Sequence, residues 1–188
     1  MIQIRQMGPD EVERIRELDV SEEGDMVYKW IAGEVVAVAK KWSRTRWSDD
    51  ECSRRADQIR QRLKIGEVLI GAFDVDRVVG LAIFREHLSS GVSEFAGLWV
   101  SRDHRRQGVA TRLADEVERR ARDAGSVALY VSAAPSCSAV GFYRSRGFRA
   151  TLGVNEELYE RAPEDIHMVL ELMREEEQAT VPTADQAL

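Results

Sequence analysis

Residues 98–110 read Leu-Trp-Val-Ser-Arg-Asp-His-Arg-Arg-Gln-Gly-Val-Ala, and this stretch decides how the surrounding chain folds. An apolar run comes first, a basic loop follows, and Gly108 stands where a helical pattern of apolar residues begins. A helix N-terminus presents unpaired backbone N–H groups, and a glycine lets the backbone approach a ligand closely. The stretch therefore predicts a strand, a phosphate-binding loop and a helix, in that order.

The basic loop carries cationic donors suited to phosphate, namely Arg105 and Arg106. Other phosphate motifs do not fit, because the sequence contains neither GxxxxGK[ST] nor GxGxxG. The cluster at 102–106 leaves contact with nucleic acid open as an alternative. We do not expect it, because the cluster has no interleaved aromatic residues and the chain carries a formal charge of −6.

A second motif lies further along the chain: Ala-Val-Gly-Phe-Tyr at 139–143, closed by Gly-Phe at 147–148. Together the two motifs resemble the acyl-CoA-binding half of the Gcn5-related N-acetyltransferases, the GNAT superfamily. The signature loop of that family reads Arg or Gln, two residues, Gly, one residue, then Gly or Ala. The resemblance implies a mixed α/β fold, with a central, mostly antiparallel sheet that contains a parallel pair at the acetyl-CoA site and is flanked by helices.

The resemblance also implies acetyl-CoA as co-substrate, without a metal. The strand before the loop would lie beside the pantetheine arm, with Trp99 directed to the opposite face, toward the acceptor. The residues that would bind acetyl-CoA are Leu98, Trp99, Val100, Arg105, Arg106, Gln107, Gly108, Val109, Ala110, Thr111, Ser136 and Tyr143. Ser136 stands where many relatives carry Asn, but its hydroxyl can still cap a helix and donate a hydrogen bond.

Two residues are candidates for acid and base chemistry. In the family pattern Tyr143 is the general acid beside the CoA sulfur, and a phenol with a pKa of about 10 is protonated at neutral pH. The histone-acetyltransferase branch has a general-base Glu at the strand position of Glu94, with an exposed strand Glu as the alternative. The branch that acetylates ribosomal protein N-termini has its base on the next strand, where this chain has Val131.

The other reactive side chains give no site. Cys137 lacks a neighbouring base in the sequence, and we expect a small buried hydrophobe. The three histidines show no metal-ligand spacing, and we expect His167 to face the polar side of a strand. Cys52 and Cys137 have no CxxC partner, so neither zinc nor a disulfide is expected, and a cytoplasmic protein is the simpler inference.

Periodicity predicts the remaining elements. We expect helices from Asp10, over 26–42, over 49–63 with Asp49 as N-cap, over 108–124 with Gly125 as the stop, and over 136–146. We expect strands over 2–5, 68–72, 78–84, 93–100, 127–131, 147–152 and 165–172. The layout predicts one domain over 1–173 and a disordered tail over 174–188. We expect no membrane span, because no stretch approaches about 18 apolar residues.

The sequence gives fewer indications about the part of the chain that would bind the acceptor. Trp30, Trp42 and Trp47 lie in a segment that would cover the acceptor cleft, where they either pack a core or contact an amine by cation–π interaction. We expect an acetyl-CoA-dependent N-acetyltransferase that acts on a primary amine, of a small molecule rather than a protein, by direct attack in a ternary complex. The alternatives are a non-catalytic acetyl-CoA-binding module and a protein lysine acetyltransferase. Homodimers are common among relatives, so a homodimer stays open.

Overall fold

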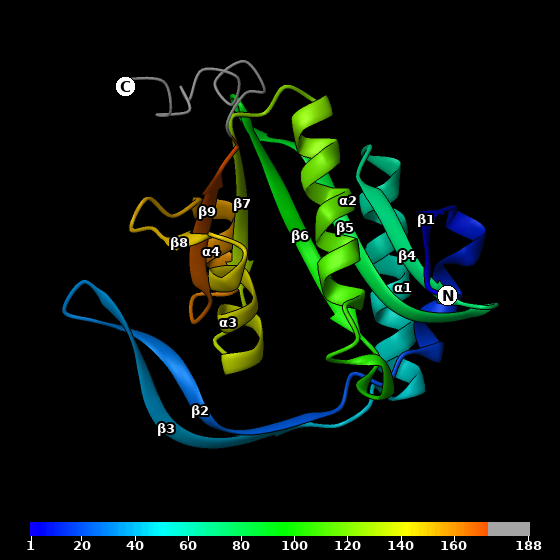
Figure 1. The fold of residues 1–188 in the computed structure, drawn as a ribbon, viewed down its shortest axis with the longest axis horizontal. Helices are drawn as coiled ribbons and strands as arrows, with labels where there is room; N and C mark the ends of the chain where they lie inside the picture. Colours follow the sequence, from blue (N-terminus) through cyan, green and yellow to red (C-terminus); the bar gives the residue numbers. More distant parts are fainter. Residues whose placement is uncertain (173–188) are drawn as a thin grey trace, which may run out of the picture.

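The computed structural model describes residues 1–172, and the predicted disordered tail over 174–188 lies outside them. A seven-stranded sheet has the order β1-β4-β5-β6-β7-β9-β8, and β2 and β3 form a separate hairpin (Figure 1). The strands of the large sheet are β1 (Gln3–Met7), β4 (Val68–Asp74), β5 (Arg77–Ser89), β6 (Val92–Val100), β7 (Ala128–Ala133), β8 (Arg149–Ala150) and β9 (Ile166–Glu171). All pairs are antiparallel except β6 with β7, so the predicted fold class is confirmed.

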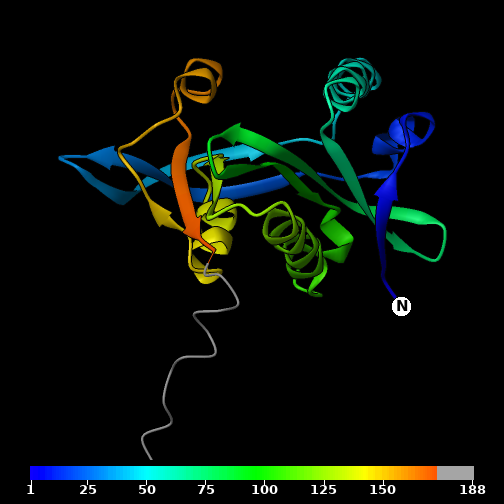
Figure 2. The same ribbon diagram turned by 90° about the horizontal axis from the view of Figure 1, so that it is seen from above.

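Helices cover both faces of the sheet. The helical elements are η1 (Pro9–Glu17), α1 (Asp49–Lys64), η2 (Arg102–His104), α2 (Val109–Asp123), α3 (Cys137–Ser145) and α4 (Glu156–Arg161). Figure 2 shows α2 and α3 on one face, with η1, α1 and α4 on the other. Each face buries its own apolar cluster, one against α2 and α3 and one against η1 and α1. The two faces therefore offer separate approaches to any opening in the sheet.

The parallel pair β6 and β7 is short. Only three residue pairs join β6 to β7, and the last of them is Glu94 with Tyr130. Just after this point β6 carries a bulge, because Phe84 pairs with Phe95 while Ile83 pairs with Gly97. A bulge bends the strand and leaves one residue unpaired. Beyond the bulge β6 and β7 diverge, and their separation is visible in Figure 1.

The predicted helix over 26–42 is wrong. This segment forms a hairpin of β2 (Glu22–Ile31) and β3 (Glu34–Arg44). The two loop residues are Ala32 and Gly33, both with positive φ, at 52° and 87°. Positive φ at both central positions matches the twist of hairpin strands. Valines in β3 also favour a strand over a helix, because β-branched side chains pack well on a pleated surface.

The other differences concern the ends and types of elements. The chain from Asp10 forms a 3-10 helix, and Ser48 rather than Asp49 caps α1, since its Oγ accepts a hydrogen bond from the Glu51 N–H at 3.3 Å. The strand expected over 147–152 is reduced to β8, and α4 was not predicted. Gly125 follows the last turn of α2 with φ of 73°, as expected for a helix stop.

Candidate active site

A cleft of about 860 Å³ opens where β6 and β7 diverge. One wall is β6 from Phe95 to Val100, and the other is β7 from Val131 onward together with α3. The phosphate loop and the start of α2 close one end. Most of the residues expected to bind acetyl-CoA line this cleft: Leu98, Trp99, Val100, Arg105, Arg106, Gly108, Val109, Ala110, Thr111, Ser136 and Tyr143.

The loop before α2 has an unusual backbone. Gly108 is the N-cap of α2 with φ of 79°, and no atom lies within 4 Å of the position that a Cβ would take there. Arg106 also has positive φ, at 61°. Gln107 is the one expected loop residue that does not line the cleft, because its Nε2 donates to the Asp103 carbonyl at 2.8 Å. The loop thus leaves open space in front of the N-terminus of α2, where the helix dipole favours an anion.

Two charged residues of the hairpin reach the same end of the cleft, and the sequence did not identify them. Arg44 of β3 donates to Glu22 of β2 at 2.8 Å, and Arg105 Nη1 lies 3.9 Å from the same carboxylate. Burial lowers the pKa of Arg44. The contact was not predicted because a helix was expected over 26–42, between these two residues, in place of the strand pairing that brings Glu22 opposite Arg44.

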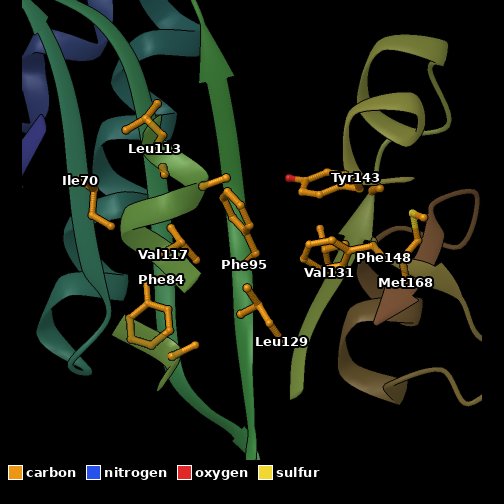
Figure 3. Close-up of a cluster of buried hydrophobic side chains, with 14 of the residues drawn as sticks. Ile70, Phe84, Phe95, Leu113, Val117, Leu129, Val131, Tyr143, Phe148 and Met168 are labelled. Atoms are coloured by element: carbon orange, nitrogen blue, oxygen red, sulfur yellow. The ribbon is translucent and has the colours of Figure 1, made fainter. Parts of the chain in front are cut away.

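Tyr143 lies on α3 and is 5 % exposed. Phe95, Phe142 and Phe148 surround its ring, with centroid distances of 5.5, 5.4 and 5.3 Å. Figure 3 shows its hydroxyl directed from α3 toward β6, across the space between the strands. Tyr143 is one of the residues that line the cleft. Burial raises the pKa of Tyr143 well above its usual range, and the Asp165 carboxylate raises it further. At neutral pH the phenol is therefore protonated and able to donate.

Glu94 lies at the vertex where β6 and β7 diverge, but it does not line the cleft. It is 1 % exposed, and burial raises its pKa. Three guanidinium groups surround it: Arg161 at 3.5 Å, Arg85 at 3.6 Å and Arg62 at 3.9 Å. The carboxylate is thus buried rather than exposed, and its role as general base stays a prediction.

A second carboxylate, which the sequence did not identify, does line the cleft. Asp165 precedes β9, and its Oδ2 accepts a hydrogen bond from Ser132 Oγ of β7 at 2.9 Å. Burial raises the pKa of Asp165. The pairing of β7 with β9 brings Asp165 beside β7, a relation between residues far apart in sequence that no local motif indicates.

The sequence profile of the acetyltransferase (GNAT) family matches residues 25–148, which cover both the diverging strands and the loop before α2. The chain belongs to this family. No curated protein sequence matches the chain.

Solved structures of GNAT proteins share the fold of this chain. Nourseothricin acetyltransferase is 20 % identical with a TM-score of 0.69, over 90 % of this chain and 98 % of that one. A candidate streptothricin acetyltransferase from Bacillus anthracis, in complex with acetyl coenzyme A, is 14 % identical with a TM-score of 0.68, over 92 % and 99 %. PaiA N-acetyltransferase from Thermoplasma acidophilum, in complex with coenzyme A, is 14 % identical with a TM-score of 0.58, over 92 % and 99 %.

The GNAT domain places two reactive side chains differently from expectation. Cys137, expected as a buried hydrophobe, is exposed at the first position of α3. Ser136 caps that helix as expected, with its Oγ accepting from the Ala139 N–H at 3.2 Å. His167, expected on the polar side of its strand, is 1 % exposed and contacts the Tyr130 hydroxyl through Nδ1 at 2.6 Å. The error arose because α4, which was not predicted, lies over this face of β9. The ring centroids of Tyr159 of α4 and His167 are 6.1 Å apart.

The tryptophans of the GNAT domain fulfil mainly structural roles. Trp99 does point to the face opposite Leu98 and Val100, where it packs against the buried Trp47 with a centroid distance of 5.9 Å. Trp42 donates its indole N–H to the Met26 carbonyl across the hairpin at 3.1 Å. Trp99 alone among these tryptophans lines the cleft. Core packing, the alternative given for the tryptophan set, therefore accounts for Trp47.

Residues 1–172 hold no group of three or more His, Cys, Asp or Glu side chains arranged to bind a metal ion. In the same part of the chain, no helix is long and apolar enough to cross a membrane.

The buried His167 predicts a pH dependence of stability. Burial lowers its folded pKa below the ordinary value of about 6.5, so below that pH the unfolded chain takes up a proton that the folded chain does not. The free energy of unfolding should fall by up to about 1.4 kcal/mol per pH unit as pH drops below about 6.5. Urea unfolding at pH 7.5 and 5.5 should show a smaller drop for His167→Gln than for wild type.

His87→Gln is the matched control, because the His87 side chain is 81 % exposed. This variant should keep the pH dependence of the wild-type protein. An equal drop for wild type and for His167→Gln would show that His167 does not stay neutral in the folded protein.

Proposed function

We propose that this GNAT protein transfers an acetyl group from acetyl-CoA to a primary amine of a small molecule, by direct attack in a ternary complex. The observation that carries the proposal is that one cleft holds both the loop at the N-terminus of α2 and the hydroxyl of Tyr143. Structures with the same fold contain acetyl-CoA or CoA. The predicted extent of the domain, residues 1–173, is part of the same proposal.

The acetyl-CoA end of the cleft fits the chemistry of its ligand. Backbone N–H groups at the start of α2, with Arg105 and Arg106, suit the pyrophosphate, and the open space at Gly108 lets it approach. Beyond its bulge, β6 has no partner strand on the β7 side, so its main chain is free to pair with the amides of the pantetheine arm. We therefore expect the thioester near the point where the two strands diverge.

The reaction needs a neutral amine, stabilisation of the oxyanion and a proton for the departing sulfur. The amine nitrogen attacks the thioester carbon, and the carbon–sulfur bond breaks as the oxyanion collapses. Tyr143 gives its proton to the sulfur. Both substrates bind together, so no covalent intermediate with the protein is required. We retain Glu94 as a candidate base, beside a second carboxylate considered below.

The hairpin supports a small acceptor rather than a protein. Val20, Glu22 and Arg44 line the cleft, and β2 contacts the start of α3 through a bridge between Val27 and Ser136. In Figure 1 the hairpin runs along the side where β6 ends and α3 begins. A strand across this rim narrows the approach for a folded protein surface. A protein lysine acetyltransferase stays an alternative, and so does a non-catalytic acetyl-CoA-binding module.

Release of CoA from acetyl-CoA tests the proposal directly. A thiol-reactive dye should report CoA formation when the protein meets its acceptor among alkyl amines, amino acids, polyamines, aminoglycosides and Lys peptides. Reactions without amine serve as controls for thioester hydrolysis. Turnover with small amines and not with peptides is the expected result. Silence across the panel, with acetyl-CoA still raising the melting temperature, would favour the binding module instead.

A further inference from the structure

The two carboxylates near the diverging strands have opposite electrostatic surroundings. Glu94 lies beneath Arg62, Arg85 and Arg161, all within 4 Å, so the protein itself compensates its charge. Asp165 forms no ion pair with any residue among 1–172, and its Oδ2 accepts only the neutral hydroxyl of Ser132. An incoming ammonium group would therefore find the uncompensated negative charge at Asp165.

Asp165 also has the required position. It lines the cleft together with Tyr143, and it is close enough for its charge to raise the pKa of that phenol. Glu94 does not line the cleft. Phe95 faces Tyr143, so the preceding residue Glu94 points to the opposite face, toward Arg62 of α1. Among residues 1–172 the cleft is lined by two carboxylates, Glu22 at the Arg105 end and Asp165 on the side of Tyr143.

The charged and titratable groups around Asp165 do not neutralise it. His167 of β9 is buried and has a lowered pKa, so it is uncharged at neutral pH. Arg161 of α4 acts only at longer range and lies 3.5 Å from Glu94, while Glu164 opposes ionisation of Asp165. Tyr143 of α3 is protonated. Burial, with a small contribution from Glu164, raises the pKa of Asp165 above that of an exposed aspartate, although Ser132, His167 and Arg161 act in the opposite direction.

We propose that Asp165 binds the ammonium group of the acceptor and removes its proton, with Ser132 holding the carboxylate in place. The proposal rests on the acetyltransferase function above. The ammonium gives one proton to Asp165 and becomes a neutral amine, which attacks the thioester carbon. The nitrogen loses a second proton to water on collapse of the adduct, while Tyr143 protonates the sulfur. The sum is acetyl-CoA and an alkylammonium ion giving amide, CoA and one proton, and both side chains return to their starting states by exchange with water.

Matched carboxylate-to-amide substitutions test the assignment. Asp165→Asn keeps the shape and the contact with Ser132 but loses the charge and the basic site. With an alkyl amine at pH 7, kcat/KM should fall about 100-fold for Asp165→Asn and much less for Glu94→Gln. With an arylamine, which is already neutral at pH 7, the effect of Asp165→Asn should shrink to a few-fold. Acetyl-CoA should raise the melting temperature of each variant as it does for wild type.

Each outcome bears on the proposal. If kcat/KM with the alkyl amine fell in Glu94→Gln and stayed near the wild-type value in Asp165→Asn, the proposal would be overturned and Glu94 would be the base. An equal loss with both acceptors would show that Asp165 does not take the amine proton. Ser132→Ala, which retains the carboxylate, should shift the acid limb of the pH profile of kcat/KM with little change in kcat at its optimum, and an unmoved limb would contradict the positioning role. No turnover by wild type would overturn the proposed function itself.

Discussion

Gly108→Val should abolish binding of acetyl-CoA while the domain stays folded. Gly108 is the N-cap of α2 with φ of 79°, and a Cβ there meets no protein atom within 4 Å. The free space lies at the end of the cleft where the backbone N–H groups point, so a valine would occupy the path of the pyrophosphate. Positive φ adds strain of about 1–3 kcal/mol for a side chain of this kind. Heat unfolding with and without acetyl-CoA measures the effect.

Gly125→Val is the matched control for that experiment. Gly125 follows the other end of α2, has φ of 73°, and likewise has no atom within 4 Å of a Cβ position. Both variants therefore carry similar backbone strain, but only one affects the loop. The Gly125 variant should lose stability and retain the upward shift in melting temperature with acetyl-CoA. A retained shift in Gly108→Val would show that acetyl-CoA does not bind at this end of α2.

The parts of the fold predicted from the sequence are those in which local signals agree. The helix α2 has apolar residues at helical spacing and a glycine at each end, and it was placed within a residue or so. The hairpin over 22–44 lacks such agreement. Its loop, Ala32-Gly33, is not one of the strong hairpin pairs. Residues 35–39 read Val-Val-Ala-Val-Ala, so no alternation of apolar and polar residues marks β3 in the sequence.

The same distinction applies to the site. The phosphate loop and Tyr143 are each part of a contiguous motif, and both line the cleft. Ser132 and Asp165 meet only because β7 pairs with β9, and Arg44 reaches the loop only through the hairpin. Glu94 shows the converse: its sequence position matched the family pattern, but it precedes the bulge and lies on the face of β6 opposite to Phe95, and it does not line the cleft. These positions depend on the pairing of strands that are far apart in the sequence, and no local motif indicates that pairing.

Tyr143→Phe should lower kcat about 100-fold, which corresponds to about 2.7 kcal/mol of lost transition-state stabilisation. The hydroxyl is the only part of the side chain removed, and Tyr143 lines the cleft. The ring keeps its packing against Phe95, Phe142 and Phe148, so the fold and the acetyl-CoA site should be retained. The dissociation constant for acetyl-CoA should change by no more than about twofold. Steady-state kinetics and calorimetric titration measure the two quantities.

Tyr28→Phe is the control, since Tyr28 belongs to the same apolar cluster without lining the cleft. Equal turnover in Tyr143→Phe and wild type would remove Tyr143 from the mechanism.

The pH profile separates the two candidate groups further. Because burial holds the pKa of Tyr143 well above its usual range, ionisation of this phenol should not limit kcat on the alkaline side at any practical pH. The acid limb should instead follow a carboxylate whose pKa burial raises, and its loss in Asp165→Asn but not in Tyr143→Phe would assign the base to Asp165 and the acid to Tyr143.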